Sequence, residues 1–469
     1  MRGWNCRDDD MDSELHCQAK RRLAVAGLAG LLLLLHFAWY LGVWPGPMGQ
    51  DGYSLIANIN QGSPRYTGKE AAWLLYALLT YGTTHRVEAL VIPSIFLHVL
   101  IFTRIISWTY AQGHRKSATF GLIFIALTPH VLNFETSLYP DSIFSLAFIG
   151  ILFEIWISLK NRKLNAYSAI SIITLLPIAA FFKGNGILII IPTLYLASRL
   201  KGGQRWIVLI TIIFWITVVQ VGGKFLQLGK GHGALKPLIL FETINFMQSR
   251  PMNLWENRHM VTDKTKTVIH QYISQENIDS LFDRDYWDTL WHQNHEQVKF
   301  RHMTKTDSRI LKREFFKYNL WRNIPAFTSS RVNIFLASCF AQGGMVSPND
   351  AQRGLQSVDT RSTFNVFNLK YLPQITNNLF ERSYSLRFLL WSPLFGIYLI
   401  FRCTALAISQ KNLDSLIITS TLISEMAGIF IFSIAAEYRY VLIIFFSPLL
   451  LLPLLSSQKT TLTHIKCQR

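Results

Sequence analysis

The sequence is built from apolar runs of about 20 residues, which alternate with short clusters of Lys and Arg. A helix needs about 20 apolar residues to cross the hydrocarbon core of a bilayer. Only 16% of the residues are charged, against about 25% in typical soluble domains. This pattern predicts an all-α polytopic membrane protein. It excludes a disordered, collagen-like or coiled-coil chain and does not suit a cytosolic enzyme.

Ten transmembrane helices are predicted from the apolar runs. The fifth and sixth runs are short, which suits a tilted or partly re-entrant segment. The predicted spans are residues 23–44, 87–110, 117–133, 140–159, 166–182, 186–197, 206–221, 386–408, 415–434 and 440–455.

The basic clusters predict which side of the membrane each loop occupies. Cytoplasmic loops are enriched in Lys and Arg, so residues 20–22 keep the amino terminus inside. Every second loop is then cytoplasmic, and each of these loops is basic. The same rule explains the net charge of +18 without a nucleic-acid partner, since no recognition module interrupts the apolar runs. We expect a multi-pass bacterial inner-membrane protein with its functional loops facing the periplasm.

Five regions follow from this topology. The long polar stretch is punctuated by prolines and shows helical spacing of aromatic and charged residues, so a mostly helical outer domain is expected there. The apolar segment 333–346 within it is too short to span, and we interpret it as interfacial. The regions are a cytoplasmic segment 1–22, a seven-span module 23–223, an outer soluble domain 224–385, three spans 386–456 and a cytoplasmic tail 457–469.

The first outer loop presents Asp51 just outside the first span. Prolines and glycines in the run WPGPMGQDG stop the preceding helix sharply. Short helices on the membrane surface are predicted at 54–60 and 71–80. Asp51 is a candidate functional carboxylate, and a helix N-cap is the alternative interpretation.

Two further outer segments carry candidate groups. In TPHVLNFETSLYPDS, Asp141 follows Pro140 at a helix opening, a role that the helix dipole alone would explain. His130 and Glu135 lie one loop away. In FFKGNG, Lys183 lies beside two glycines, a combination that suits a phosphate site, although a lysine snorkelling to the membrane surface is equally compatible.

The last candidates are Glu437 and Arg439, in a short loop between the final spans. An outer arginine opposes the charge bias, so a lipid phosphate or an acidic neighbour is expected beside it. Glu425 differs because it falls near the middle of the ninth span, where an ionisable group is expensive.

These segments, in this order, resemble the GT-C superfold of integral membrane glycosyltransferases. The likeness is to the branch of lipid A aminoarabinose transferases, protein mannosyltransferases and O-antigen glucosyltransferases, and it covers residues 20–200 and 310–455. It is carried by the acidic first loop, YPDS, FKGNG, FFKYNLWRNIPAFTSSRVNIF and the final RYVL.

The resemblance implies transfer of a sugar from a polyprenyl-phosphate donor to a glycolipid, lipopolysaccharide O-antigen, other polysaccharide or protein acceptor. By analogy Asp51 would be the catalytic base, and Asp141 would act with it at the acceptor. Lys183 and Arg439 would bind the donor phosphate. The residues expected to support the acceptor site are Tyr53, His130, Glu135 and Glu437. Several relatives carry two adjacent acidic residues in the first loop, whereas Gly52 follows Asp51 here, so a divalent metal on Asp51 and Asp141 is left open.

Two other functions fit a multi-span protein with a large outer region. A polysaccharide polymerase would depend on outer arginines more than on Asp51. A lipid-linked glycan transporter or flippase would place ionisable groups at mid-membrane, and Glu425 is the feature in its favour. The identities of the sugar and of the acceptor do not follow from the sequence.

Overall fold

The computed structural model describes residues 11–62, 70–226, 235–249, 261–291 and 298–467, and these residues form helices and no strand. The chain divides into two compact units. Unit 1 contains residues 1–229, 346–425 and 442–469, and unit 2 contains residues 230–345 and 426–441. The expected outer domain, 224–385, therefore overlaps unit 2 over 230–345, while its last forty residues belong to unit 1.

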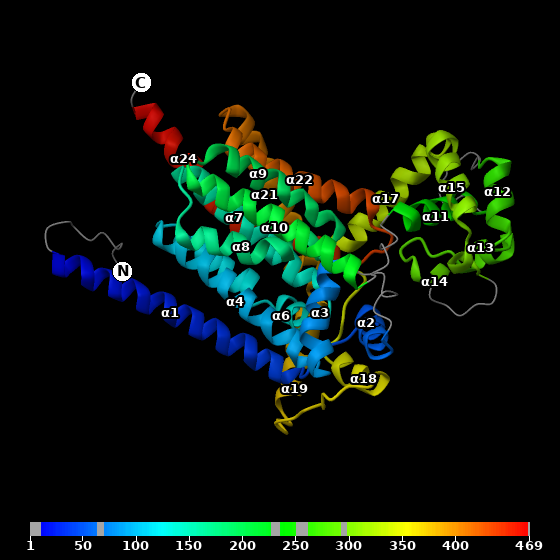
Figure 1. Cartoon of the computed structure of the whole chain (residues 1–469), viewed down its shortest axis with the longest axis horizontal. Helices are drawn as coiled ribbons and strands as arrows, with labels where there is room; N and C mark the ends of the chain where they lie inside the picture. Colours follow the sequence, from blue (N-terminus) through cyan, green and yellow to red (C-terminus); the bar gives the residue numbers. More distant parts are fainter. Residues whose placement is uncertain (1–10, 63–69, 227–234, 250–260, 292–297, 468–469) are drawn as a thin grey trace. The chain divides into compact units, whose positions relative to one another are not determined.

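Unit 1 is a bundle of long helices joined by short ones (Figure 1). In chain order its helices are α1 (Met11–Gly42), α2 (Gln50–Asn60), α3 (Ala71–Thr84), α4 (Glu88–Ala111), α5 (Arg115–Gly121), the π-helix η2 (Leu122–Ala126), α6 (Pro129–Thr136), α7 (Pro140–Asn161), α8 (Ala166–Phe181), the 3-10 helix η3 (Gly184–Ile189), α9 (Ile190–Arg199), α10 (Gly203–Phe225), α18 (Asp350–Ser357), α19 (Leu372–Ser385), α20 (Arg387–Leu390), α21 (Leu394–Ser409), most of α22 (Leu413–Phe432), α23 (Leu442–Phe446) and α24 (Pro448–Cys467).

The chain is an all-α, multi-pass membrane protein. Seven helices among the described residues are long and apolar enough to cross a membrane, or eight if one bent pair counts as a span. They are Arg22–Gly42, Glu88–Ala111, Pro140–Asn161, Gly203–Phe225, Arg387–Ser409, Leu413–Phe432 and Tyr438–Ser457. The predicted fifth and sixth spans correspond to α8, of 16 residues, and to the short η3 and α9. The count of ten spans remains a prediction.

The predicted third span is broken rather than straight. Its two halves, Arg115–Ala126 and Pro129–Thr136, meet at an angle of 57°. Pro129 begins α6, and Thr128 before it has an extended backbone. A proline disfavours helical geometry in the residue before it and lacks an amide donor, so the helix ends and restarts at this point.

Helix α7 is the centre of unit 1. The whole of its apolar stretch is buried, whereas only 17% of the corresponding stretch in α10 is buried. Pro140 opens α7 and Asp141 lies in its first turn, as the sequence predicts. Proline is favoured at that position and the helix dipole favours the carboxylate. The first turn of α7 is therefore held inside the bundle and not at its rim.

Unit 2 is a smaller helical unit with its own core. Phe246 and Phe315 stack in it, with ring centroids 6.1 Å apart. Its helices are α11 (Leu235–Phe246), α12 (Asp263–His270), α13 (Gln275–Leu281), α14 (Asp288–Trp291), the 3-10 helix η4 (Phe300–His302), α15 (Lys305–Glu314), the π-helix η5 (Phe315–Asn319), α16 (Leu320–Arg322), α17 (Ile324–Cys339), the end of α22 and the 3-10 helix η6 (Tyr438–Val441).

A fully buried ion pair lies within unit 2. Arg331 of α17 contacts Glu242 of α11, and neither side chain is exposed. The Arg331 guanidinium also donates to the backbone carbonyls of Ile431 and Ser433. Burial raises the pKa of Glu242, and the Arg331 charge opposes that effect. Breaking one member of such a pair strands a charge, so the contact joins three segments of unit 2 firmly.

Three helices of unit 2 are capped by hydroxyl side chains. Thr262, Ser274 and Thr304 accept hydrogen bonds from backbone amides at the starts of α12, α13 and α15. At α15 the Asp307 carboxylate accepts hydrogen bonds from the Tyr272 hydroxyl at 2.6 Å and from the Thr304 hydroxyl at 2.7 Å. These bonds favour the ionised form, so they lower the pKa of Asp307.

We predict that the close contact between α21 and α23 leaves no room for a side chain at Gly396. A Cβ on Gly396 would lie 2.1 Å from the Ile444 carbonyl oxygen, whereas a Cβ on Gly428 would meet nothing within 4 Å. Gly396→Ala should destabilise the protein by about 1–3 kcal/mol, since the backbone cannot yield easily. Thermal unfolding in detergent measures it. Gly428→Ala is the matched control and should be neutral or slightly stabilising. Equal unfolding temperatures for Gly396→Ala and Gly428→Ala would contradict the close contact at Gly396.

We also predict an acid-sensitive contact at α15. Because the folded pKa of Asp307 lies below its ordinary value of 3.8, its stabilising effect is complete above that value and is lost as the pH falls through the lower folded pKa. After correction for the intrinsic pH dependence of exchange, amide protection in α15 should therefore fall between pH ~5 and ~2, and Asp307→Asn should remove that change. The control is Asp263→Asn, whose side chain is fully exposed in the first turn of α12. The same pH response in both variants would disprove the contact's role.

Candidate functional site

The first loop of unit 1 is fastened to the segment that precedes α7. The Leu138 amide donates to the Pro47 carbonyl at 3.2 Å. A Cβ on Gly49 would lie 1.9 Å from the Tyr139 hydroxyl oxygen, and one on Gly52 would lie 3.1 Å from Leu138 Cβ. A side chain at Gly49 would have to displace the Tyr139 ring, so glycine lets the loop lie closely against residues 138–139.

Asp51 lies between these two glycines, in the first turn of α2. Gly49 is the N-cap of that helix, so the interpretation of Asp51 as the cap is wrong. The Asp51 side chain is partly buried. The loop that carries it therefore packs on the residues immediately before Asp141, although about ninety residues separate the two in sequence. That their carboxylates face each other across a cavity stays a prediction.

Asp141 and Lys183 form an ion pair. Lys183 Nζ lies 2.5 Å from Asp141 Oδ1, and the two side chains are 22% and 4% exposed. The ammonium also lies 5.8 Å from the centroid of the Phe144 ring. The buried Asp141 carboxylate needs a counterion, and the partly exposed Lys183 ammonium supplies it.

The Lys183 turn is packed closely against protein. A Cβ on Gly186 would lie 2.3 Å from the Ala179 carbonyl oxygen, so Gly186 serves packing against α8 and not ligand approach. A Cβ on Gly184 would lie 3.1 Å from Glu70 Oε1. Burial of that carboxyl end raises the pKa of Glu70. Sequence reasoning missed Glu70, because nothing in the pattern brings the start of α3 to this turn.

Asn185 and Glu425 extend the same cluster. Asn185 Nδ2 donates to Glu425 Oε2 at 2.5 Å, and Lys183 interacts electrostatically with the same carboxylate. Glu425 is completely buried, and its Oε1 has no hydrogen-bond partner among the described residues. Three carboxylates, those of Asp141, Glu70 and Glu425, thus surround the Lys183 turn. The sequence flagged Glu425 by its position in a span, but it gave no sign of Asn185 as its partner.

Two of the predicted acceptor residues lie inside the bundle. Glu135 Oε1 bonds to His36 Nδ1 of α1 at 2.6 Å, and both side chains are fully buried. His130 lies between the rings of Trp391 and Phe445, with centroids 4.9 and 4.6 Å away. Both side chains are buried in unit 1, and their support of an acceptor site stays a prediction.

The third acceptor candidate, Tyr53, is half-buried on α2. Burial and the nearby Asp350 carboxylate raise the pKa of its phenol. Asp350 begins α18, and a Cβ on Gly354 of that helix would lie 2.9 Å from Met48 Cβ. Helix α18 therefore covers the first loop beside Asp51.

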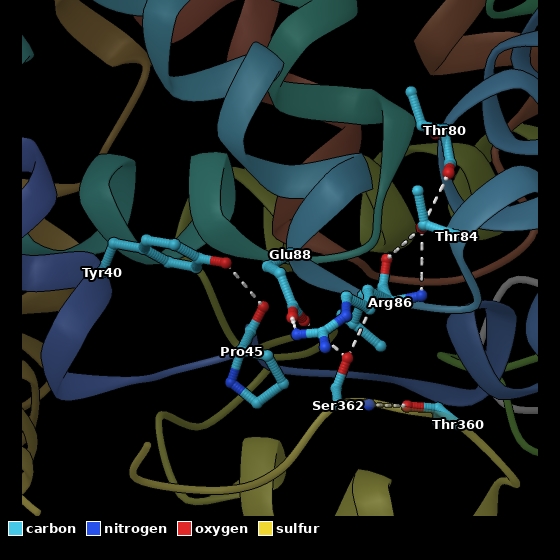
Figure 2. Close-up of polar contacts among 9 residues, drawn as sticks. Tyr40, Pro45, Thr80, Thr84, Arg86, Glu88, Thr360 and Ser362 are labelled. Atoms are coloured by element: carbon cyan, nitrogen blue, oxygen red, sulfur yellow. Dashed lines mark hydrogen bonds and ion pairs between the residues drawn. The ribbon is translucent and has the colours of Figure 1, made fainter. Parts of the chain in front are cut away.

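Figure 2 shows a second buried acid near this loop, at the start of α4. Glu88 accepts from the Ser362 hydroxyl at 2.5 Å and from Arg86 at 3.2 Å. The Val87 amide donates to the same hydroxyl at 2.7 Å, and Tyr40 donates to the Pro45 carbonyl at 3.2 Å. The bonds of Ser362 join the segment around residue 362 to the start of α4. The Tyr40 bond holds the chain in place where it leaves α1. Sequence reasoning did not identify Glu88.

The candidates Glu437 and Arg439 belong to unit 2, whereas Lys183 belongs to unit 1. Arg439 Nε contacts Glu437 Oε2, and the Tyr286 hydroxyl donates to Glu437 Oε1 at 3.0 Å. The acidic neighbour expected beside an outer arginine is therefore Glu437. That Lys183 and Arg439 bind one phosphate stays a prediction.

No group of three or more His, Cys, Asp and Glu side chains in the described part of the chain is arranged to hold a metal ion. Comparison with protein-family models, with curated proteins and with solved structures found no match to this chain. The site is therefore interpreted from its own chemistry.

We predict strong energetic coupling between Asp141 and Lys183. Lys183→Met or Asp141→Asn alone removes one member of the pair. Such a loss costs roughly 3–5 kcal/mol in a fully buried pair and less here, because Lys183 is partly exposed and also interacts with Glu425. The double variant should recover part of that loss. Thermal unfolding of the wild type, both single variants and the double variant gives the coupling energy.

The exposed pair Arg162–Asp414, with side chains 56% and 22% exposed, is the control for this cycle. Its coupling should be about 1 kcal/mol or less. If the Asp141–Lys183 cycle gives a coupling no larger than this control, the pair does not stabilise the site.

Proposed function

We propose that this chain is a membrane glycosyltransferase that moves a sugar from a polyprenyl-phosphate donor to an acceptor hydroxyl. The acceptor would be a glycolipid, a polysaccharide such as an O-antigen, or a protein, on the periplasmic side of a bacterial inner membrane. The observation that carries the proposal is the meeting of the Asp51 loop with the start of α7, where Asp141 pairs with Lys183. The segments that carry a candidate base and a candidate phosphate ligand thus both contact the start of α7.

The reaction would invert the sugar's anomeric centre. Asp51 would take the proton from the acceptor hydroxyl, whose oxygen forms the new bond to the sugar. The bond from the sugar to the phosphate oxygen breaks, and its electron pair leaves on the polyprenyl phosphate. A hydroxyl is a weak nucleophile until its proton is removed, and a phosphate leaves readily once its charge is paired.

Lys183 would provide that pairing by exchanging partners. Before the donor binds, Asp141 is its counterion. The donor phosphodiester carries a single negative charge, like a carboxylate, but it gains charge as the sugar leaves, so the ammonium would pair with it more strongly as the bond breaks. Asp141 would then be available to orient the acceptor. Arg439 would give the phosphate a second cation by the same exchange with Glu437.

A divalent metal between Asp51 and Asp141 does not suit this arrangement. The Lys183 ammonium lies beside the Asp141 carboxylate and repels a second cation there, and it would stay in the site after it turns to the donor phosphate. We therefore route no step through a metal and assign both carboxylates to proton transfer and orientation.

One observation favours a second function, transport of a lipid-linked glycan. Glu425 is buried within a candidate span and has an oxygen without a partner in the described structure. Buried ionisable groups at membrane depth are typical of coupled transporters. A transporter would depend on Glu425, whereas a transferase would depend on Asp51.

We predict that Asp51→Asn reduces sugar transfer on the order of 10²-fold or more, because it keeps the side chain's size and removes the base. The assay supplies polyprenyl-phosphate glucose, mannose or aminoarabinose, together with a glycolipid, O-antigen or protein acceptor, to the purified protein in liposomes and measures released polyprenyl phosphate. Polyprenyl phosphate alone should still raise the unfolding temperature of the variant.

Asp359→Asn is the control, since Asp359 is exposed and its recorded hydrogen bonds use its backbone oxygen. It should keep full activity. Normal transfer by Asp51→Asn would rule out this mechanism. Loss of lipid-linked glycan translocation in Glu425→Gln, with no transfer by the wild type, would support the transporter.

A further inference from the structure

Helix α19 exposes an apolar stripe in unit 1. Tyr371, Ile375 and Leu379 follow one another at helical spacing and are 78%, 53% and 47% exposed. Leu386, one residue beyond the helix, continues the same stripe and is 48% exposed. We call these four residues the α19 apolar stripe. Such a row of exposed apolar side chains is unusual on a surface that faces water.

The orientation of α19 is fixed by a second, buried face. Thr376, Phe380 and Ser383 are buried. A Cβ on Gly42, at the end of α1, would lie 2.0 Å from Thr376 Oγ1 and 3.3 Å from the Leu372 carbonyl oxygen, so α19 packs closely on the end of α1. Phe380 contacts the Trp391 ring at 5.5 Å. The apolar stripe therefore cannot turn inward without losing this packing.

A third face of the same helix is exposed and polar. It consists of Gln374, Asn378, Glu381 and Ser385, which all lie on the surface. At 3.6 residues per turn this row lies about 100° from the apolar stripe. One helix thus carries a polar row and an apolar row, and Arg382 is the exposed polar residue that falls on the apolar side. Uniform contact with water would not require this separation, whereas a boundary between water and lipid would.

The position of α19 in unit 1 agrees with such a boundary. Gly42, against which it packs, ends one candidate span, Arg22–Gly42. The chain leaves α19 directly into another candidate span, Arg387–Ser409. The exposed Phe367 contacts the Trp44 ring at 5.6 Å, just after the end of the first of these spans. Helix α19 therefore lies at the level where two membrane helices end.

The charges around the stripe are positive. Residues 361–389 contain four basic residues and one acidic residue, a net charge of 4 − 1 = +3. Arg387 also lies 4.2 Å from the centroid of the Tyr384 ring. A hollow beside the stripe is lined by Asn368, Leu369, Lys370, Tyr371, Leu372 and Ile375. Cations beside aromatic and aliphatic side chains match the phosphates and acyl chains of anionic lipids.

We propose that the α19 apolar stripe lies in the interfacial layer of the bilayer, with Lys370, Arg382 and Arg387 contacting the phosphates of anionic phospholipids. This site is separate from the Asp51 and Lys183 cluster and does not depend on the proposed transfer reaction. A second copy of the chain is the other occupant to consider. Continuity with a candidate span and the excess of positive charge favour lipid.

The test places a fluorophore on each exposed row. In the full chain with its cysteines replaced by serine, bimane is attached at Ile375→Cys or Leu379→Cys, and in matched controls at Asn378→Cys or Glu381→Cys. The protein is reconstituted in phosphatidylglycerol–phosphatidylcholine liposomes that contain head-group nitroxide lipid. Quenching by the lipid should be several-fold stronger at 375 and 379 than at 378 and 381, and quenching by aqueous iodide should show the reverse order.

The charge contribution has its own readout. Lipid quenching at 375 should increase when the nitroxide is carried by phosphatidylglycerol instead of phosphatidylcholine, and Lys370→Gln with Arg382→Gln should remove that increase. Equal lipid quenching on both rows would overturn the proposal. Protection of 375 and 379 from both quenchers, together with a disulfide-linked dimer of the unlabelled Ile375→Cys variant, would assign the stripe to a second copy and would also overturn it.

Discussion

A charged side chain buried among apolar helices must find a partner, and this requirement shapes unit 1. Arg104 binds Glu154 at 2.7 Å, Lys183 binds Asp141 at 2.5 Å, and His36 contacts Glu135 at 2.6 Å. Each contact joins helices that are separate in sequence. Because a stranded charge inside the bundle costs several kcal/mol, these pairs restrict how the helices can be arranged more strongly than apolar packing, which tolerates repacking.

The sequence predicts the helices of unit 1 well because each depends on local features. Hydropathy and flanking charge locate the long spans, and Pro140 with Asp141 predicts the start of α7. The short helices expected at 54–60 and 71–80 are confirmed within α2 and α3. The length of an apolar run is a weaker guide to a membrane span where a proline interrupts the run. The predicted third span is such a case and appears as a bent pair of helices.

The partners within the candidate site were not predictable in the same way. Lys183 and Asp141 were each identified, but as separate groups with separate roles. The contacts of Asn185 with Glu425 and of Ser362 with Glu88 depend on which helices lie side by side. Lateral packing is a property of the whole bundle, and no local period encodes it. Roles inferred from single residues therefore need revision once a partner is seen, as with the enclosed His130 and Glu135.

The construction of unit 2 constrains the order in which the protein can be completed on the ribosome. Its core is assembled from residues 230–345 and 426–441, so its last segment emerges long after the rest. Arg331 and Glu242 both belong to the first segment of unit 2 to be synthesised. The bonds of Arg331 to the Ile431 and Ser433 carbonyls require about 100 further residues. At translation rates of roughly 5–20 residues per second this delay is on the order of 5–20 s. During that interval the intervening membrane helices are inserted, and the nascent unit holds a guanidinium with only part of its final hydrogen bonding. A chaperone that recognises the incomplete unit would have its opportunity in that interval.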